Sequence, residues 1–323
     1  MLSQSVFDAN KVALICVPSS AGARQVGQEQ APRCLRASGL VQRLRSNGFE
    51  VVDLGDLTQV AFSPDMENSK QQNLKLVLSV LRQVANAVES AIANRAWPLV
   101  IGGDCTITIG VLAALTKHFA GLGMTYVDGD VDLNTPATTN SGIFDGMVLA
   151  HILGRGADEL CHFGSRYPLL EEKNITLFGY SVQAGGLDPV EIELLKDTRM
   201  AKYPLEKIKD QVRTAATEAL RELESKTEHI LVHFDVDVVD FDDFPAVDVP
   251  HKPGLSLLQA QEALGVFLGS RKSMGLVVTE FNAGLDSGGK LARQLTDVIQ
   301  AVVAKRRASS HKDELEKGSA AGT

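Results

Sequence analysis

Short apolar segments of strand length alternate along this chain with longer segments in which apolar residues recur at helical spacing. This alternation is typical of βαβ units, which place parallel strands in a central sheet and cover both of its faces with helices. The pattern therefore predicts an α/β fold, namely a three-layer sandwich around a mostly parallel, doubly wound sheet. The predicted strands are residues 12–17, 50–54, 98–101, 123–127, 175–179, 229–234 and 275–279.

Helices are expected between these strands. The longest covers residues 73–94, where apolar residues gather on one face, and others are expected at 34–44 and 106–114. No internal repeat or linker interrupts the pattern, so we expect residues 1–307 to form a single domain. Residues 308–323 are rich in Ser, Gly, Ala and Lys without apolar periodicity, which predicts a disordered tail.

Composition and charge narrow the range of partners. The 323 residues carry a formal net charge of −8, whereas nucleic-acid binding relies on clustered Lys and Arg, so no nucleic-acid partner is expected. No apolar run approaches the ~20 residues that span a bilayer, and the amino terminus lacks the features of a signal peptide. The four cysteines form no CxxC pair and suggest no disulfide framework. These features predict a cytoplasmic protein with no membrane partner.

Acidic residues follow several of the predicted strands. In open α/β sheets, ligands bind at the carboxyl ends of the strands, where these acids would meet. Side chains two residues apart on an extended strand point the same way, so Asp128, Asp130 and Asp132 are expected to converge if their segment stays extended. The same holds for Asp235 and Asp237. Several carboxylates this close together stay ionised only beside a cation and otherwise bind protons, so the clusters predict a divalent metal ion. The alternative for any single Asp is that it lies in a solvated turn or caps a helix.

Several separated motifs resemble, in the same order, those of the arginase (ureohydrolase) family. They are residues 102–105 (GGDC), 127–136 (VDGDVDLNTP), 139–142 (TNSG), 234–237 (FDVD) and 280–282 (EFN). The loop at 17–22 and the segments 31–36 and 54–57 match as well, so the resemblance spans nearly the whole chain. Agmatinases share the metal motifs, but the Asn-Thr-Pro and Thr-Xaa-Ser-Gly stretches are more similar to arginases.

The resemblance implies a centre of two Mn²⁺ ions. Asp128 and Asp235 would bridge the ions, and Asp132 and Asp237 would complete the site, with Asp132 also counted among the catalytic residues. In this family the metals activate a water molecule that attacks the guanidinium carbon. The implied activity is metal-dependent hydrolysis of a guanidino C–N bond.

The resemblance also implies how a substrate is held. Glu280 would bind the guanidinium through charge-assisted hydrogen bonds, and Asn134 and Ser141 would bind the α-carboxylate. The implied substrate is arginine, or an arginine-like group on a larger molecule, and the products are urea and an ornithine-type compound. Arginases commonly form trimers or hexamers, so a homo-oligomer is implied here.

The chain departs from the family pattern at three positions. Cys105 and Asp130 stand where the family has metal-binding histidines, and Asp145 stands where it has a proton-shuttling histidine. Cys and Asp also bind metals, so both remain expected ligands, and Asp145 remains a catalytic candidate. The added negative charge would weaken the metals as Lewis acids, and the sulfur favours zinc or iron over manganese.

His233 lies two residues before Asp235, so on an extended strand both side chains face the same side. It is a candidate ligand, a candidate cation beside the extra acids, or a candidate base; the alternative is a strand histidine bonded to the backbone. Two functions therefore stay open. The retained acids favour a hydrolase, and the missing histidines favour a non-catalytic arginase-like protein that keeps the fold for binding or assembly.

Overall fold

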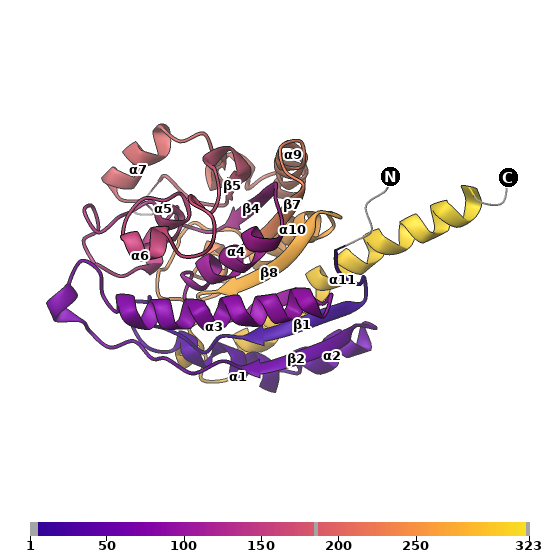
Figure 1. Ribbon diagram of the computed structural model, residues 1–323, viewed down its shortest axis with the longest axis horizontal. Coiled ribbons are helices and arrows are strands. Elements are labelled where there is room, and N and C mark those ends of the chain that lie inside the picture. The colour runs from indigo at the N-terminus through magenta and orange to yellow at the C-terminus, as the bar shows by residue number, and fades with distance from the viewer. Residues whose placement is uncertain (1–5, 184–186, 321–323) are drawn as a thin grey trace.

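The computed structural model describes residues 6–183 and 187–320, with side chains described as far as residue 307. Eight strands form one sheet in the order β2-β1-β3-β8-β7-β4-β5-β6, and every neighbouring pair is parallel (Figure 1). The strands are β1 Lys11–Cys16, β2 Glu50–Asp56, β3 Trp97–Ile101, β4 Leu122–Val127, β5 Ile175–Phe178, β6 Ala201–Tyr203, β7 His229–Asp235 and β8 Ser273–Thr279.

The inner strands are buried on both faces. Every residue of β3, β4, β5 and β8 is buried, as expected for a parallel sheet that helices cover on both sides. This is why the sequence shows these strands as continuous apolar runs. The edge strand β6 has three half-buried residues and no such run, so the sequence analysis did not predict it.

Helices pack against both faces of the sheet (Figure 1). On one side α3 and α4 pack together near β1 and β3, whereas α10 packs on β7 and β8 and also contacts α9 and α11. The helices are α1 Ala31–Ala37, α2 Leu40–Ser46, α3 Leu74–Ala93, α4 Ile107–His118, α5 Val148–Ile152, α6 Asp158–Cys161, α7 Pro189–Lys196, α8 Leu205–Ile208, α9 Val212–Glu224, α10 Leu257–Leu268 and α11 Lys290–Ala320.

Residues 34–44, predicted as one helix, belong to two. Gly39 lies between α1 and α2 and adopts a left-handed φ of 85°, a conformation that glycine tolerates without steric cost. The chain therefore turns after Ser38, and α2 begins in a new direction. The single-helix prediction was wrong because the apolar spacing continues across the turn.

Helix α3 is long and apolar enough to cross a membrane by length and composition alone. Its apolar face, however, is buried: Val77, Val80, Leu81, Val84 and Val88 are at most 2% exposed. Polar residues of the opposite face stand between these apolar residues along the chain, so no continuous apolar run marks the helix in the sequence. The apolar residues are those that a helix covering a sheet requires.

Helix α11 continues beyond residue 307, so the backbone of residues 308–320 is helical within the predicted tail. Its last turns extend away from the body of the protein (Figure 1). Residues 321–323 lie outside the described part of the chain. The domain boundary predicted at residue 307, with a disordered segment beyond it, stays a prediction.

Two glycines inside helices test the helix packing, because one is closely surrounded by a neighbouring helix and the other has room around it. A Cβ on Gly110 of α4 would lie 2.9 Å from the carbonyl oxygen of Leu81 in α3, whereas a Cβ on Gly265 of α10 would meet only Lys305, at 3.7 Å. We expect Gly110→Ala to lower the free energy of unfolding by ~1–3 kcal/mol, because the two helices must separate. Gly265→Ala should raise it by up to ~1 kcal/mol. Denaturant unfolding checks both, and effects of the same sign would contradict this packing.

Candidate metal centre

The candidate site lies at the carboxyl edge of four neighbouring strands. Cys105 comes after β3, Asp128 follows β4, Asp235 ends β7 and Glu280 follows β8. These strands are adjacent in the order β3-β8-β7-β4, at the middle of the sheet. Residues that are far apart in the sequence therefore meet at one edge, where ligands of open α/β sheets bind.

One group of metal-ligand atoms lies beside β7. It consists of Cys105, Asp128, His233 and Asp235, whose ligand atoms are all within 4.8 Å of one another. The Cys105 thiol donates to Asp235 Oδ2 at 2.7 Å, and its Sγ lies 3.5 Å from His233 Nε2. Asp128 Oδ2 is buried without a hydrogen-bond partner. An unpaired buried carboxylate oxygen is costly, so this group fits a bound cation.

A second group consists of Asp130, Asp237 and His251. His251 Nε2 lies 3.4 Å from Asp130 Oδ2 and 3.7 Å from Asp237 Oδ1, and it has no hydrogen-bond partner although the residue is buried. His251 was not among the site residues predicted from the sequence. It belongs to the loop before α10, and its distance along the chain from the acids follows no ligand spacing.

A third group surrounds the predicted substrate-binding acid. The backbone N–H of Cys105 donates to Asp145 Oδ1 at 2.9 Å and to Glu280 Oε1 at 3.1 Å, and the three residues could share a cation. The side-chain amide of Gln28 donates to the other oxygen of Glu280. Gln28 is fully buried and its Oε1 has no partner, yet nothing in the sequence distinguished it from other loop residues.

Asp132 is hydrogen-bonded to a tyrosine. Its Oδ2 accepts a hydrogen bond from the Tyr126 hydroxyl, and within the described residues it belongs to none of the three groups. The backbone of Asp132 has a φ of 44°, so the segment after β4 is not extended. The extended segment that would point Asp128, Asp130 and Asp132 the same way is therefore not present, but Asp132 still lies close enough to Asp128 and Asp130 for these acids to raise its pKa. Its predicted roles as a metal ligand and a catalytic residue stay predictions.

The two residues predicted to bind an α-carboxylate lie in loops at this edge. Asn134 Nδ2 donates to Asp188 Oδ2 at 3.3 Å, and the hydroxyl of exposed Ser141 lies 3.3 Å from that of Thr139. Asp188 follows residues 184–186, which lie outside the described part of the chain. The roles of Asn134 and Ser141 stay predictions.

The electrostatics of the cluster favour a cation. Burial raises the pKa of five carboxyls well above the ordinary value, and repulsion from neighbouring acids raises it further. These are Asp128, Asp132, Asp145, Asp235 and Glu280. Burial also raises the pKa of Asp237, to about 6. Without metal the cluster must hold protons, which a divalent cation would replace.

The two imidazoles of the cluster differ in charge. Burial lowers the pKa of His233 to about 3, so this ring is neutral. Burial also lowers the pKa of His251, but Asp237 and Asp130 outweigh it and raise the pKa to about 9. Burial raises the pKa of the Cys105 thiol as well, and repulsion between a thiolate and the nearby acids raises it further.

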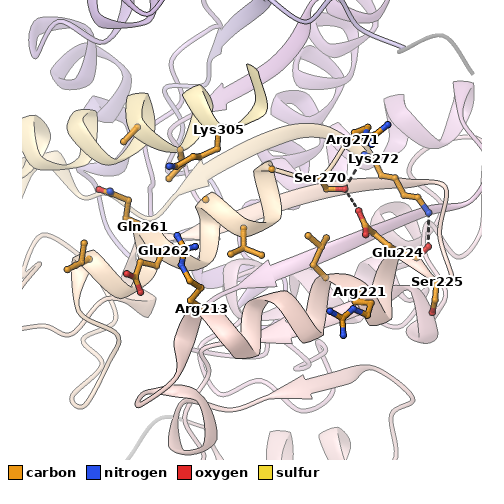
Figure 2. Close-up of a pocket in the computed structure, with 17 residues that line it drawn as sticks. Arg213, Arg221, Glu224, Ser225, Gln261, Glu262, Ser270, Arg271, Lys272 and Lys305 are labelled. Carbon is orange, nitrogen blue, oxygen red and sulfur yellow. Dashed lines mark hydrogen bonds between the residues drawn. The ribbon is translucent and has the colours of Figure 1, made fainter. Parts of the chain in front are cut away.

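A large surface groove lies away from this cluster. It has a volume of about 1250 Å³ and runs between α9, α10 and α11, with Arg213, Arg221 and Glu262 in its lining (Figure 2). Part of its wall is fixed by the hydrogen bonds of Ser270 and Lys272 to Glu224. The lining contains none of the clustered acids, so this groove does not serve the candidate chemistry.

Together these observations define an α/β protein with a buried metal-ligand cluster at the carboxyl edge of a parallel sheet. The family model described as "Arginase family" matches residues 10–304, and the chain belongs to this family. Arginase from Brevibacillus brevis is 30% identical over 293 residues, which cover 90% of this chain and 97% of that protein.

Solved structures agree in fold. Arginase from Bacillus caldovelox is 27% identical with a TM-score of 0.81, covering 91% of this chain and 98% of that one. A structure of Trypanosoma cruzi formiminoglutamase with Mn²⁺ has a TM-score of 0.71 and 18% identity, covering 92% and 93% of the two chains, and this likeness concerns the fold alone. The comparisons confirm the predicted family and the predicted arginase-like fold.

The shifted pKa values predict how the stability of the metal-free protein depends on pH. Asp237 has a folded-state pKa of about 6, and burial raises that of Glu191, which accepts from the N–H of Leu133, to about 8. Above about pH 4 the folded state therefore holds protons that the unfolded chain has lost, so stability falls as the pH rises through these values. We expect the Tm of chelator-treated protein to fall between about pH 5 and about pH 8.

Saturating divalent metal should reduce this fall, because the metal takes the place of the protons. Scanning calorimetry with and without metal measures both slopes. A Tm of the metal-free protein that rises steadily over the same range would contradict the assignment of raised pKa values to the cluster.

Proposed function

We propose that this protein is a metal-dependent hydrolase that cleaves a guanidino C–N bond. Its substrate would be arginine or an arginine-like group, and its products urea and an ornithine-type compound. The observation that carries the proposal is the convergence of Cys105, Asp128 and Asp235 at one sheet edge, next to the buried carboxylate of Glu280. Membership of the arginase family supports the same reaction class.

Two divalent ions are the proposed cofactors. Cys105, Asp128 and Asp235 would hold one ion, and Asp130 and Asp237 would help to hold the other. When bound, such ions supply Lewis acidity and lower the pKa of water. Manganese is the metal bound in the formiminoglutamase structure, whereas the thiol of Cys105 also suits zinc or iron.

The protein's own residues would position the guanidinium. Glu280 is 2% exposed and is fixed by the N–H of Cys105, so it offers a planar acceptor in a fixed orientation. The other oxygen of Glu280 now accepts from the Gln28 amide, which the guanidinium would replace as donor. Asp145, beside Glu280 and with a raised pKa, would carry a proton at its carboxyl group.

The remaining partners are proposed from the family alone. Asn134 and Ser141 would bind the α-carboxylate of a free amino-acid substrate. A homo-oligomer, a trimer or a hexamer, and a cytoplasmic location stay predictions.

The proposal predicts the metal content. Purified protein loaded with Mn²⁺ should hold about two equivalents per chain, lose them to a chelator and release urea from arginine only when metal is present. Its Tm should rise with metal concentration, because an ion that binds only the folded state stabilises it by mass action. Elemental analysis, thermal unfolding and a urea assay provide the measurements.

Two outcomes would count against the proposal in different ways. Fewer than about half an equivalent of metal, with no change in Tm, would reject the metal centre. Metal binding without urea release from a panel of guanidino compounds would favour the non-catalytic alternative, in which the fold serves binding or assembly.

Replacing the proposed guanidinium acceptor gives a sharper test. Glu280→Gln keeps the size of the side chain but removes its charge, so we expect turnover to fall by roughly 10²- to 10³-fold while the metal content is retained. Glu191→Gln is the matched control, because Glu191 is also buried and accepts from a backbone N–H, that of Leu133. Wild-type turnover in the Glu280→Gln variant would remove Glu280 from the mechanism.

A further inference from the structure

We infer that His233 and His251 are metal ligands of this centre and supply the imidazoles that the chain lacks at positions 105 and 130. The inference rests on the proposed metal centre, and it assigns ligands outside the motifs that carry the family resemblance. Each histidine lies beside one of the two residues that replace a family histidine. The evidence for each is separate.

His233 is held in the orientation of a ligand. Its Nε2 lies 3.5 Å from Cys105 Sγ and 3.9 Å from Asp128 Oδ2, inside the first group of ligand atoms. Its other nitrogen, Nδ1, lies 2.9 Å from the hydroxyl of Thr108, and the ring stacks on Tyr126 at 4.2 Å. Metal-binding histidines commonly use the second nitrogen in this way, which fixes the ring and directs the first nitrogen at the metal.

His251 reaches the cluster from the loop before α10. The residue is 5% exposed, and its Nε2 has no hydrogen-bond partner but lies at ion-pair distance, 3.4 and 3.7 Å, from carboxylate oxygens of Asp130 and Asp237. A metal ion that binds there would take the place of the Nε2 proton between the same acids. The ring approaches so closely because residue 129 is glycine. A Cβ at Gly129 would lie 2.3 Å from His251 Cδ2, so any larger residue would displace the ring.

A purely structural histidine looks different in the same protein. His151 is fully buried, and both of its ring nitrogens have backbone partners: Nδ1 lies 2.7 Å from the Met147 carbonyl, and Nε2 accepts from the N–H of Ala157 at 3.0 Å. By contrast, the Nε2 atoms of His233 and His251 face ligand atoms of the cluster. A metal ion is the partner that both nitrogens would share with the neighbouring acids.

This assignment also changes the charge of the centre. Imidazole contributes a ligand atom without negative charge, whereas the Asp132 carboxylate, a ligand expected from the motifs, has one oxygen that accepts from Tyr126. With the two histidines as ligands, two divalent ions face four carboxylates and one thiol. The site is then less anionic than the six acidic ligands expected from the motifs, so its metals remain stronger Lewis acids.

The test compares three single variants, His233→Leu, His251→Leu and the control His151→Leu. Each protein is loaded with Co²⁺, dialysed and measured for metal content and for the absorption band of a thiolate bound to cobalt. We expect the wild-type protein and His151→Leu to keep about two equivalents, and each test variant to keep about one. His233→Leu should lose or shift the thiolate band, and His251→Leu should retain it.

A loss of metal in the single variants could also come from misfolding, so a second set of variants places a histidine at the neighbouring position instead. Asp130→His added to His251→Leu, and Cys105→His added to His233→Leu, should restore the second equivalent of metal. Gly129→Ala keeps His251 but displaces its ring, so it should weaken binding of one equivalent by about 10-fold or more. Recovery in the double variants would show that an imidazole is required at each group.

The outcomes separate this inference from the proposed function. Two equivalents of unchanged affinity in both His→Leu test variants would overturn the ligand assignment while leaving the metal centre in place. An equal loss of metal in His151→Leu, or no recovery in the double variants, would also overturn it. A wild-type protein without bound metal would reject the proposed centre itself, together with the inference.

Discussion

Carboxyl groups buried at one sheet edge repel one another, and each loses the hydration that stabilises its ionised form. In this protein the effect raises the pKa of Asp128, Asp235 and Glu280 together, and no packing arrangement of apolar residues would relieve it. The hydrogen bonds and neighbouring side chains of the site partly offset this repulsion. Hydroxyl, amide and thiol donors cap individual oxygens, while imidazoles face the rest, and a cation is the remaining way to balance the charge.

The parts of the site that the sequence predicted are those that a strand positions directly. A buried parallel strand is visible as an apolar run, and the residue after it lies at the carboxyl edge, so the sequence alone places Asp235 and Glu280 there. Parallel pairing of β7 with β4 and β8 then brings these acids together without further information. Strand position alone thus accounts for the core of the cluster.

The parts that the sequence did not predict depend on loops. His251 and Gln28 reach the cluster through turns whose paths are set by tertiary contacts, such as the approach of His251 to Gly129. The left-handed backbone of Asp132 likewise redirects its side chain to Tyr126, which the rule of alternating side chains cannot anticipate. Hence the family motif identifies the positions at the edge, while the loops decide which side chains join each group of ligand atoms.

The environment of Glu280 limits how a substrate could bind in the proposed function. One of its oxygens accepts from the fixed N–H of Cys105, and the other accepts from the neutral amide of Gln28. A guanidinium presents charged donors in a planar fork, and its hydrogen bonds to a carboxylate are roughly twice as strong as neutral ones, so it can replace the amide but not the backbone N–H. Gln28 would then need a new partner, and its unpaired Oε1 shows that its present position is already incompletely satisfied. The selectivity of the site for a guanidino group would therefore depend on the ease with which Gln28 is displaced, as well as on Glu280.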